Sequence, residues 1–198
     1  MPKNKGRNKN DSTYIPRKQR ESRTPQQPDI ILTHDFKANE QPWILVLDPS
    51  STACGWALFL GETLRRCGVW RAGAGPMESR VDRLCECLTA SLPDINMVVV
   101  EISSRIAYNA RRAKSLPALL YAQGRLEQAA RGQVTKCHRV TEQEWTGRKP
   151  KHQRAKMVAL LEPVYRQFAP RDKGLDAADA VGLGQWWISQ QKIRGATA

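Results

Sequence analysis

Four acidic residues occupy positions where a buried carboxylate would be costly. Asp48 ends the apolar run WILVLD, and Glu101 follows the apolar run MVVV. Asp176 and Asp179 belong to the segment DAADA, and their i, i+3 spacing places both carboxylates on one face of a helix. Carboxylates that meet in apolar surroundings repel each other and lose hydration, unless positive charge lies between them. The four residues therefore predict a cation site.

Oxygen ligands of this kind suit Mg²⁺, and two such ions roughly 3.5–4 Å apart can hold a phosphodiester, activate water and stabilise the leaving oxygen. Three of the acids also have a structural alternative. Asp48 can cap its turn, Asp176 can cap its helix, and Glu101 can pair with Arg105. The strand-end positions in a strongly basic chain favour the metal hypothesis over these alternatives taken together.

The elements that must position these acids follow from hydrophobic periodicity. Short apolar runs predict strands at 43–48, 54–60, 63–71, 96–102 and 134–140. Amphipathic or basic segments predict helices at 76–92, at 106–131 with an interruption near Pro117, at 152–168 with a kink at Pro163, and from about 176. A tight turn at Gly61-Glu62 joins the second strand to the third. The order βββαβαβαα predicts an α/β fold with a mixed sheet covered by helices.

The charge of the chain is unevenly distributed. Its 198 residues carry a net charge of +13. Residues 1–25 contain eight lysines and arginines against two acids, and residues 105–166 contain fourteen against four. Such clustering is typical of nucleic-acid binding. We expect a disordered basic arm over 1–42, a folded domain over 43–190 and a flexible tail over 191–198.

Several classes of protein are disfavoured. No apolar run approaches the roughly 20 residues that cross a bilayer, and the N-terminal segment has no apolar stretch typical of a secretory signal. We therefore expect a cytoplasmic protein without a membrane partner. The five irregularly spaced cysteines predict reduced thiols rather than disulfides or a zinc site. No Ser-His-Asp or Cys-His arrangement is evident, and no small-molecule cofactor is expected.

Three segments in order, ILVLDPSSTACGWALF, VVVEIS and LDAADAVGLG, resemble the RuvC-like Holliday-junction resolvases of the RNase H-like superfamily. The resemblance covers about residues 43–188. It implies a five-stranded mixed β-sheet flanked by α-helices, a homodimer, and cleavage of branched DNA that depends on Mg²⁺ or Mn²⁺. The long basic arm is not usual in the compact bacterial enzymes, and it suggests a divergent version such as one from a phage or other mobile element.

The resemblance also implies roles for single residues. Asp48, Glu101, Asp176 and Asp179 would be the metal ligands, and Asp48 would be shared by two ions. Lys151 would approach the scissile phosphate, with Lys149 as its near rival. Two positions depart from the family. Ser50 stands where glycine is frequent, and the junction-opening aromatic after Glu101 is missing, with Tyr108 the nearest replacement.

A set of polar and basic residues is expected to contact DNA. Its members are Ser50, Ser51, Arg105, Tyr108, Arg111, Arg112, Lys114, Arg125, Arg131, Lys149 and Lys151. Three alternatives to a branched-DNA endonuclease stay open at this point. They are a catalytically weak binding protein on the same fold, an RNase H-like nuclease for RNA–DNA hybrids, and an actin-like ATPase. The last would need a second phosphate loop and a glycine-rich adenosine site, and neither is evident.

Overall fold

The structure is a computed structural model that describes residues 41–91, 95–103, 110–132, 134, 136–147 and 149–196. The predicted basic arm lies outside the described residues, apart from its last two positions. None of the described helices is both long and apolar enough to span a membrane. All five cysteines are free thiols, as predicted.

Five strands form one mixed sheet in the order β3-β2-β1-β4-β5. Their bounds are β1 Trp43–Pro49, β2 Ala53–Leu60, β3 Thr63–Arg71, β4 Met97–Ile102 and β5 Lys136–Thr141. β1, β2 and β3 form an antiparallel meander, whereas β4 runs parallel to both β1 and β5. The predicted tight turn between β2 and β3 is confirmed, with Gly61 at φ 56°. The fold class and the five strands predicted from the sequence are therefore confirmed.

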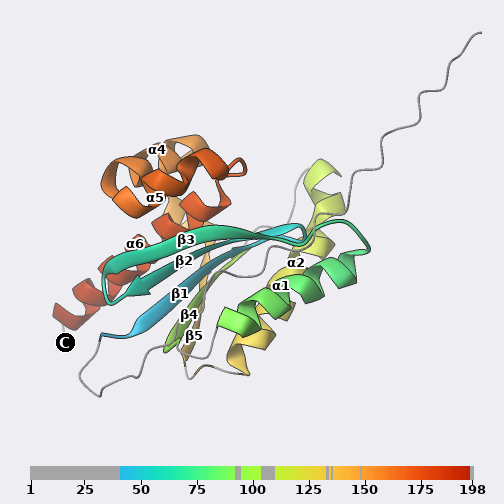
Figure 1. Ribbon diagram of the computed structural model, residues 1–198, viewed down its shortest axis with the longest axis horizontal. Helices are drawn as coiled ribbons and strands as arrows, with labels where there is room; N and C mark the ends of the chain where they lie inside the picture. The colour runs from blue at the N-terminus through green and yellow to red at the C-terminus, as the bar shows by residue number, and fades with distance from the viewer. Residues whose placement is uncertain are drawn as a thin grey trace, which may run out of the picture.

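Both faces of the central strands are buried, because helices cover the sheet on two sides (Figure 1). Leu45 and Leu47 of β1 pack in the core shared with α1 (Met77–Ser91) and α2 (Ala110–Arg131). Their neighbours Ile44 and Val46 pack in the opposite core, towards α6. Strands buried on both faces read as continuous apolar runs, which explains the composition of β1 and β4.

The helical segment that follows β5 contains more and shorter helices than the sequence predicted. It consists of α3 Glu142–Thr146, α4 Lys151–Leu161, α5 Pro163–Phe168, the 3₁₀ turn Ala169–Arg171 and α6 Asp176–Ala196. The expected helix over 152–168 is two helices, because Pro163 ends one and begins the next. The predicted interruption of α2 at Pro117 was wrong, since the helix continues through it. α6 continues past the predicted domain boundary at residue 190 and reaches Ala196.

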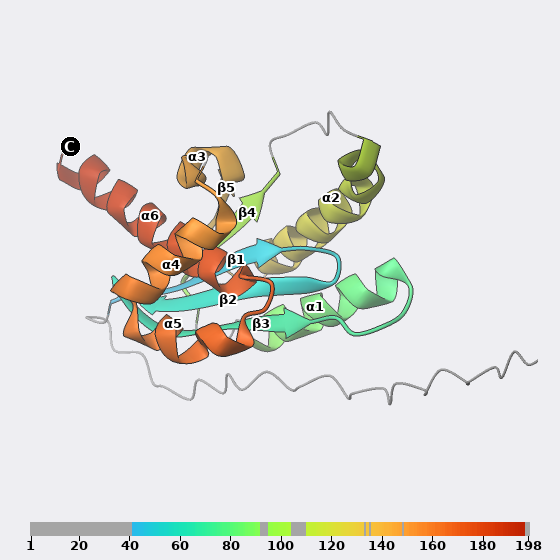
Figure 2. The ribbon, with the colours of Figure 1, turned by 90° about the horizontal axis from the view of Figure 1, so that it is seen from above.

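α6 lies directly on the sheet through small residues. Ala177, Ala180 and Val181 are fully buried against it, as their sizes predicted. A side chain at Gly184 would overlap the ring of Phe59 of β2, so the close approach depends on glycine there. Figure 2 shows α4 beside α6, on the same side of the sheet. This packing carries the N-terminus of α6 to the carboxyl end of β1.

Candidate active site at the ends of the central strands

Asp48 and Glu101 lie on neighbouring parallel strands at the same edge of the sheet. The register of β1 and β4 pairs Leu47 with Val100, so the next residue on each strand is one of the two acids. Asp48 is half-buried, with its side chain 16% exposed. The sequence prediction that the two carboxylates meet at one strand end agrees with this register.

The close approach of α6 to β2 brings Asp176 to the same edge. Gly55 of β2 pairs with Asp48 across the antiparallel ladder. A Cβ atom at Gly55 would overlap the backbone carbonyl of Asp176, so only glycine leaves room for the start of α6 there. The missing side chain of Gly55 therefore lets Asp176 lie beside the end of β1.

Asp172 holds the start of α6, a role that the sequence analysis had considered for Asp176. Its carboxylate is 2% exposed and accepts the backbone N–H groups of Asp176 at 3.0 Å and Ala178 at 2.9 Å. Tyr165 donates its hydroxyl to the same carboxylate at 3.2 Å. Leu175, immediately before the helix, has a left-handed backbone at φ 59°, which is strained for leucine. With the helix capped by Asp172, the carboxylate of Asp176 is left to face the site.

Lys151, the first residue of α4, joins three of the four carboxylates. Its ammonium lies 2.8 Å from Asp176, 3.2 Å from Asp179 and 3.9 Å from Asp48. Lys149, by contrast, is exposed, and its ammonium lies 3.9 Å from the sulfur of Met157. The geometry therefore places Lys151 among the carboxylates and Lys149 away from them.

Two further residues contact the acids, and the sequence analysis did not single them out. Arg154 of α4 donates two hydrogen bonds to Asp179, at 2.9 and 2.8 Å. Trp145 of α3 donates its indole N–H to Glu101 at 2.7 Å. A signal for Arg154 was present in the sequence, because it follows Lys151 with the same i, i+3 spacing that separates Asp176 from Asp179. For Trp145 no comparable signal exists.

Burial dominates the electrostatics of the strand-end acids. It raises the pKa of Asp48 well above its ordinary value, with repulsion from Glu101 in addition and partial compensation from Lys151. Burial likewise raises the pKa of Glu101 to about 7, although the hydrogen bond from Trp145 opposes the shift. Burial alone would lower the pKa of Lys151, but Asp48, Asp176 and Asp179 outweigh it and raise the pKa. Ionisation of Asp48 and Glu101 therefore costs free energy in the folded protein, and additional positive charge in the site would reduce this cost.

The acids fit a divalent cation by donor type and by charge. Their ligand atoms are carboxylate oxygens, which Mg²⁺ and Mn²⁺ accept. Among the described residues, no group of three or more acidic, histidine or cysteine side chains is already arranged around a common metal position. Asp176 and Asp179 are instead paired with Lys151 and Arg154 of α4. A bound metal ion would therefore have to compete with these ion pairs.

The residues expected to contact DNA are distributed differently. The hydroxyl of Ser50 holds its own turn, donating to the carbonyl of Ala53 at 2.8 Å and accepting its N–H at 3.1 Å. The carbonyl of Ser51 accepts a hydrogen bond from Arg80 at 3.1 Å. Thus the turn after Asp48 is held by Ser50 and by α1.

The remaining expected contacts belong to the segment 105–131 of the chain. Arg105 and Tyr108 lie outside the described residues, and only the backbone is described for Arg111, Arg112 and Lys114. Arg125 pairs with Asp82 at 2.9 Å, and Arg131 pairs with Glu127 at 2.7 Å. Both guanidinium groups remain about half exposed, so the ion pairs leave part of each facing solvent.

No family model and no curated protein sequence matches the chain. Solved structures do match. The RuvC of T. thermophilus in complex with Holliday junction substrate has a TM-score of 0.59 and 19% identity, over 77% of this chain and 96% of that chain. The yeast mitochondrial Holliday junction resolvase Ydc2 has a TM-score of 0.53 and 13% identity, over 76% and 80% of the two chains. The five-stranded mixed sheet and its flanking helices are thus the RNase H-like fold of the RuvC-type resolvases.

Proposed function

We propose that this protein is a divalent-metal-dependent endonuclease that cleaves phosphodiester bonds in branched DNA such as Holliday junctions. One observation carries the proposal: Asp48, Asp176 and Asp179 converge on the ammonium of Lys151, with Glu101 on the adjacent strand. The fold shared with two Holliday junction resolvases supports the substrate class. The net charge of +13 supports a nucleic-acid partner.

In this proposal Asp48, Glu101, Asp176 and Asp179 hold two Mg²⁺ ions, for which Mn²⁺ can substitute. Bound in this way, the ions would supply orientation of the phosphodiester, activation of water and stabilisation of the leaving oxygen. The four side chains contribute fixed oxygen ligands from β1, β4 and α6. Because the ligands come from two strand ends and from the first turn of a helix that packs on the sheet, they would need little reorganisation at the moment of reaction.

Lys151 has a separate task. Its ammonium pairs with Asp176 and Asp179, and its side chain is 38% exposed. Its role in this proposal would be to direct the ammonium to the scissile phosphate, where it would stabilise the negative charge that develops during cleavage.

The basic residues outside the site supply affinity without sequence choice, because phosphate contacts position DNA but carry little sequence information. Lys149 and the arginines and lysines of α2 are the candidates within or beside the folded domain. A homodimer would place two such sites on one junction and make paired nicks.

The test uses end-labelled four-way, flap, splayed and linear DNAs and an RNA–DNA hybrid, each incubated with Mg²⁺ or with EDTA. We expect Mg²⁺-dependent products from the branched DNAs. Asp48→Asn should keep junction binding and lose cleavage, because it removes the carboxylate at the centre of the site. Normal cleavage by this variant at saturating Mg²⁺ would contradict the assignment, and cleavage confined to the hybrid would change the substrate.

A further inference from the structure

The facing surfaces of α4 and α6 form a ladder of two ion pairs. Lys151 and Arg154 are three residues apart on α4, and Asp176 and Asp179 are three residues apart on α6. Lys151 pairs with Asp176 at 2.8 Å, and Arg154 pairs with Asp179 at 2.8 Å. Equal spacing on both helices puts one cation opposite each aspartate. The ladder therefore fixes how α4 faces the site.

The two cations of the ladder differ in their freedom to move. The side chain of Lys151 is 38% exposed, whereas that of Arg154 is 11% exposed. The guanidinium of Arg154 binds both oxygens of Asp179 and also donates to the carbonyl of Lys149 at 2.6 Å. It lies over the ring of Trp145, with the guanidinium carbon 5.0 Å from the ring centroid. Because Asp179, the carbonyl of Lys149 and the ring of Trp145 all contact this planar guanidinium, it keeps the carboxylate of Asp179 in one orientation.

Trp145 extends this network to a second carboxylate. Its indole N–H donates to Glu101 at 2.7 Å, while its ring supports Arg154. Trp145 sits on α3, whose start is fixed by a capping box in which Thr141 and Glu144 bond each other reciprocally. The contacts therefore run without a break from Asp179 through Arg154 and Trp145 to Glu101.

The geometry points to Arg154 as a positioning residue of the active site, which acts together with Trp145 to orient Asp179 and Glu101. This inference rests on the proposed function, since it takes these two acids as metal ligands. Residues that hydrogen-bond to ligands, without touching the metal, typically change metal affinity or activity by about 10–100-fold when they are replaced. The alternative role for Arg154 is neutralisation of the negative charge of Asp179 alone.

The two roles predict different results for Arg154→Lys. Lysine keeps the positive charge but lacks the planar guanidinium that donates to both oxygens of Asp179. Positioning predicts that Arg154→Lys binds Mn²⁺ about tenfold more weakly, or worse, and cleaves more slowly even at saturating metal. Mere neutralisation predicts unchanged binding for Arg154→Lys and tighter Mn²⁺ binding for Arg154→Gln, because a competing cation has been removed.

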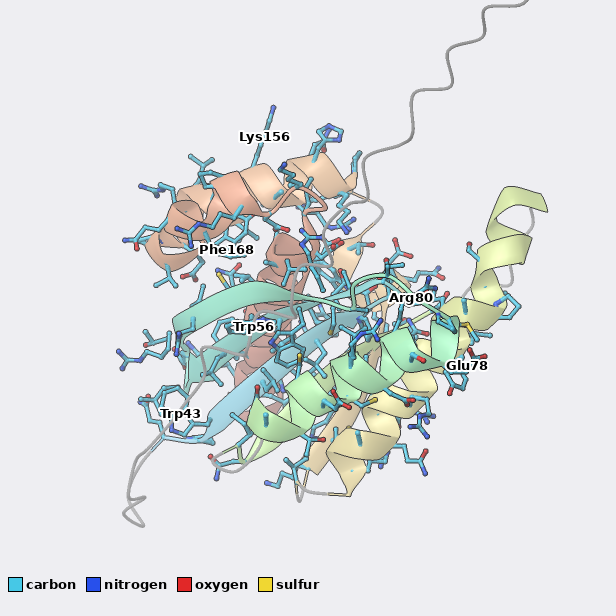
Figure 3. The ribbon with its side chains drawn as sticks, turned by 45° about the vertical axis from the view of Figure 1, so that its right-hand side comes forward. Trp43, Trp56, Glu78, Arg80, Lys156 and Phe168 are labelled. Atoms are coloured by element: carbon cyan, nitrogen blue, oxygen red, sulfur yellow. The ribbon has the colours of Figure 1, made fainter. Side chains whose placement is uncertain are left out.

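The experiment is calorimetric titration of the metal-free proteins with Mn²⁺ alone, followed by single-turnover cleavage of a four-way junction. Lys156→Gln is the matched control, because Lys156 lies on the same helix, is exposed and points away from the rest of the molecule (Figure 3). Trp145→Phe is the second variant. Phenylalanine keeps an aromatic ring under Arg154 and removes only the hydrogen bond to Glu101, so we expect weaker Mn²⁺ binding there as well.

Each outcome decides the inference. Wild-type affinity in Arg154→Lys or in Trp145→Phe overturns it, and if Arg154→Lys does not fold, Trp145→Phe alone decides. Weakened binding in both variants, with Lys156→Gln unchanged, supports it. If the wild-type protein binds Mn²⁺ but cuts no DNA, the proposed function fails while the binding data still decide the role of Arg154. If the wild-type protein binds no Mn²⁺, both proposals fail.

Discussion

Replacing Glu101 with glutamine should stabilise the metal-free protein at alkaline pH. Burial raises the pKa of Glu101 from an ordinary value of 4.5 to about 7. Glutamine is nearly isosteric and keeps an oxygen that accepts the indole N–H of Trp145. The substitution therefore removes the costly charge with little change in packing.

The sign and size of the effect follow from proton linkage. Below pH 4.5 the carboxyl of Glu101 is protonated in both the folded and the unfolded protein, so the charge costs nothing. Between pH 4.5 and about 7 the folded protein binds a proton that the unfolded chain has lost, so the free energy of unfolding falls as the pH rises. Above pH 7 the full cost is present, and it amounts to at most about 3 kcal/mol.

The assay is thermal unfolding followed by circular dichroism, with EDTA present, at pH 5 and pH 8. We expect Glu101→Gln to raise the melting temperature at pH 8 by roughly 5–10 °C and to change it little at pH 5. Mg²⁺ should then stabilise the wild-type protein more than the variant, because only the wild type has all four proposed ligands.

Glu127→Gln provides a control of opposite sign. Burial alone would raise the pKa of Glu127, but hydrogen bonds from Arg139 and Arg131, each at 2.7 Å, outweigh it and lower the pKa. Losing this charge should cost about 1–3 kcal/mol at pH 8. If Glu127→Gln is destabilised as expected and Glu101→Gln is no more stable than wild type at pH 8, the electrostatic reasoning about the site is refuted.

Three further substitutions test the construction of the site. Lys151→Gln should slow cleavage by roughly 10²-fold or more at saturating Mg²⁺ with junction binding nearly unchanged, because the developing charge on the phosphate loses its partner. Gly55→Ala should lower the free energy of unfolding by about 1–3 kcal/mol in urea titrations, because its methyl group meets the carbonyl of Asp176. Asp172→Ala should cost about 1–2 kcal/mol in the same assay, because the start of α6 loses its cap.

The sequence was sufficient for the strands and for the meeting of the strand-end acids, because both depend on local patterns. The alternation of short apolar runs with turns identified β1 and β4, and their parallel arrangement placed Asp48 beside Glu101. The small residues of α6 predicted its contact with the sheet, and their burial confirms it. α3 escaped prediction because five residues are too few to show a helical period.

The surroundings of the acids could not be predicted in the same way, because they depend on tertiary packing. The cap at Asp172 is separated from its helix by a loop in which Leu175 adopts a left-handed backbone, and leucine gives no signal for such a turn. The i, i+3 pairs on α4 and α6 are visible in the sequence. However, only the packing of α4 against α6 determines that Arg154 faces Asp179 rather than solvent.

Under the proposed function, Lys151 would link the charge state of the acids to the presence of DNA. Its ammonium pairs with Asp176 and Asp179 at 2.8 and 3.2 Å, so a divalent cation that binds the same oxygens would compete with it. A displaced ammonium without a new partner is costly in a half-buried site, whereas a DNA phosphate offers it one. Under the proposed function, metal and DNA should therefore each raise the affinity of the other by the same factor. Arg154 would not change partners in this way, because its guanidinium is largely buried and stays paired with Asp179.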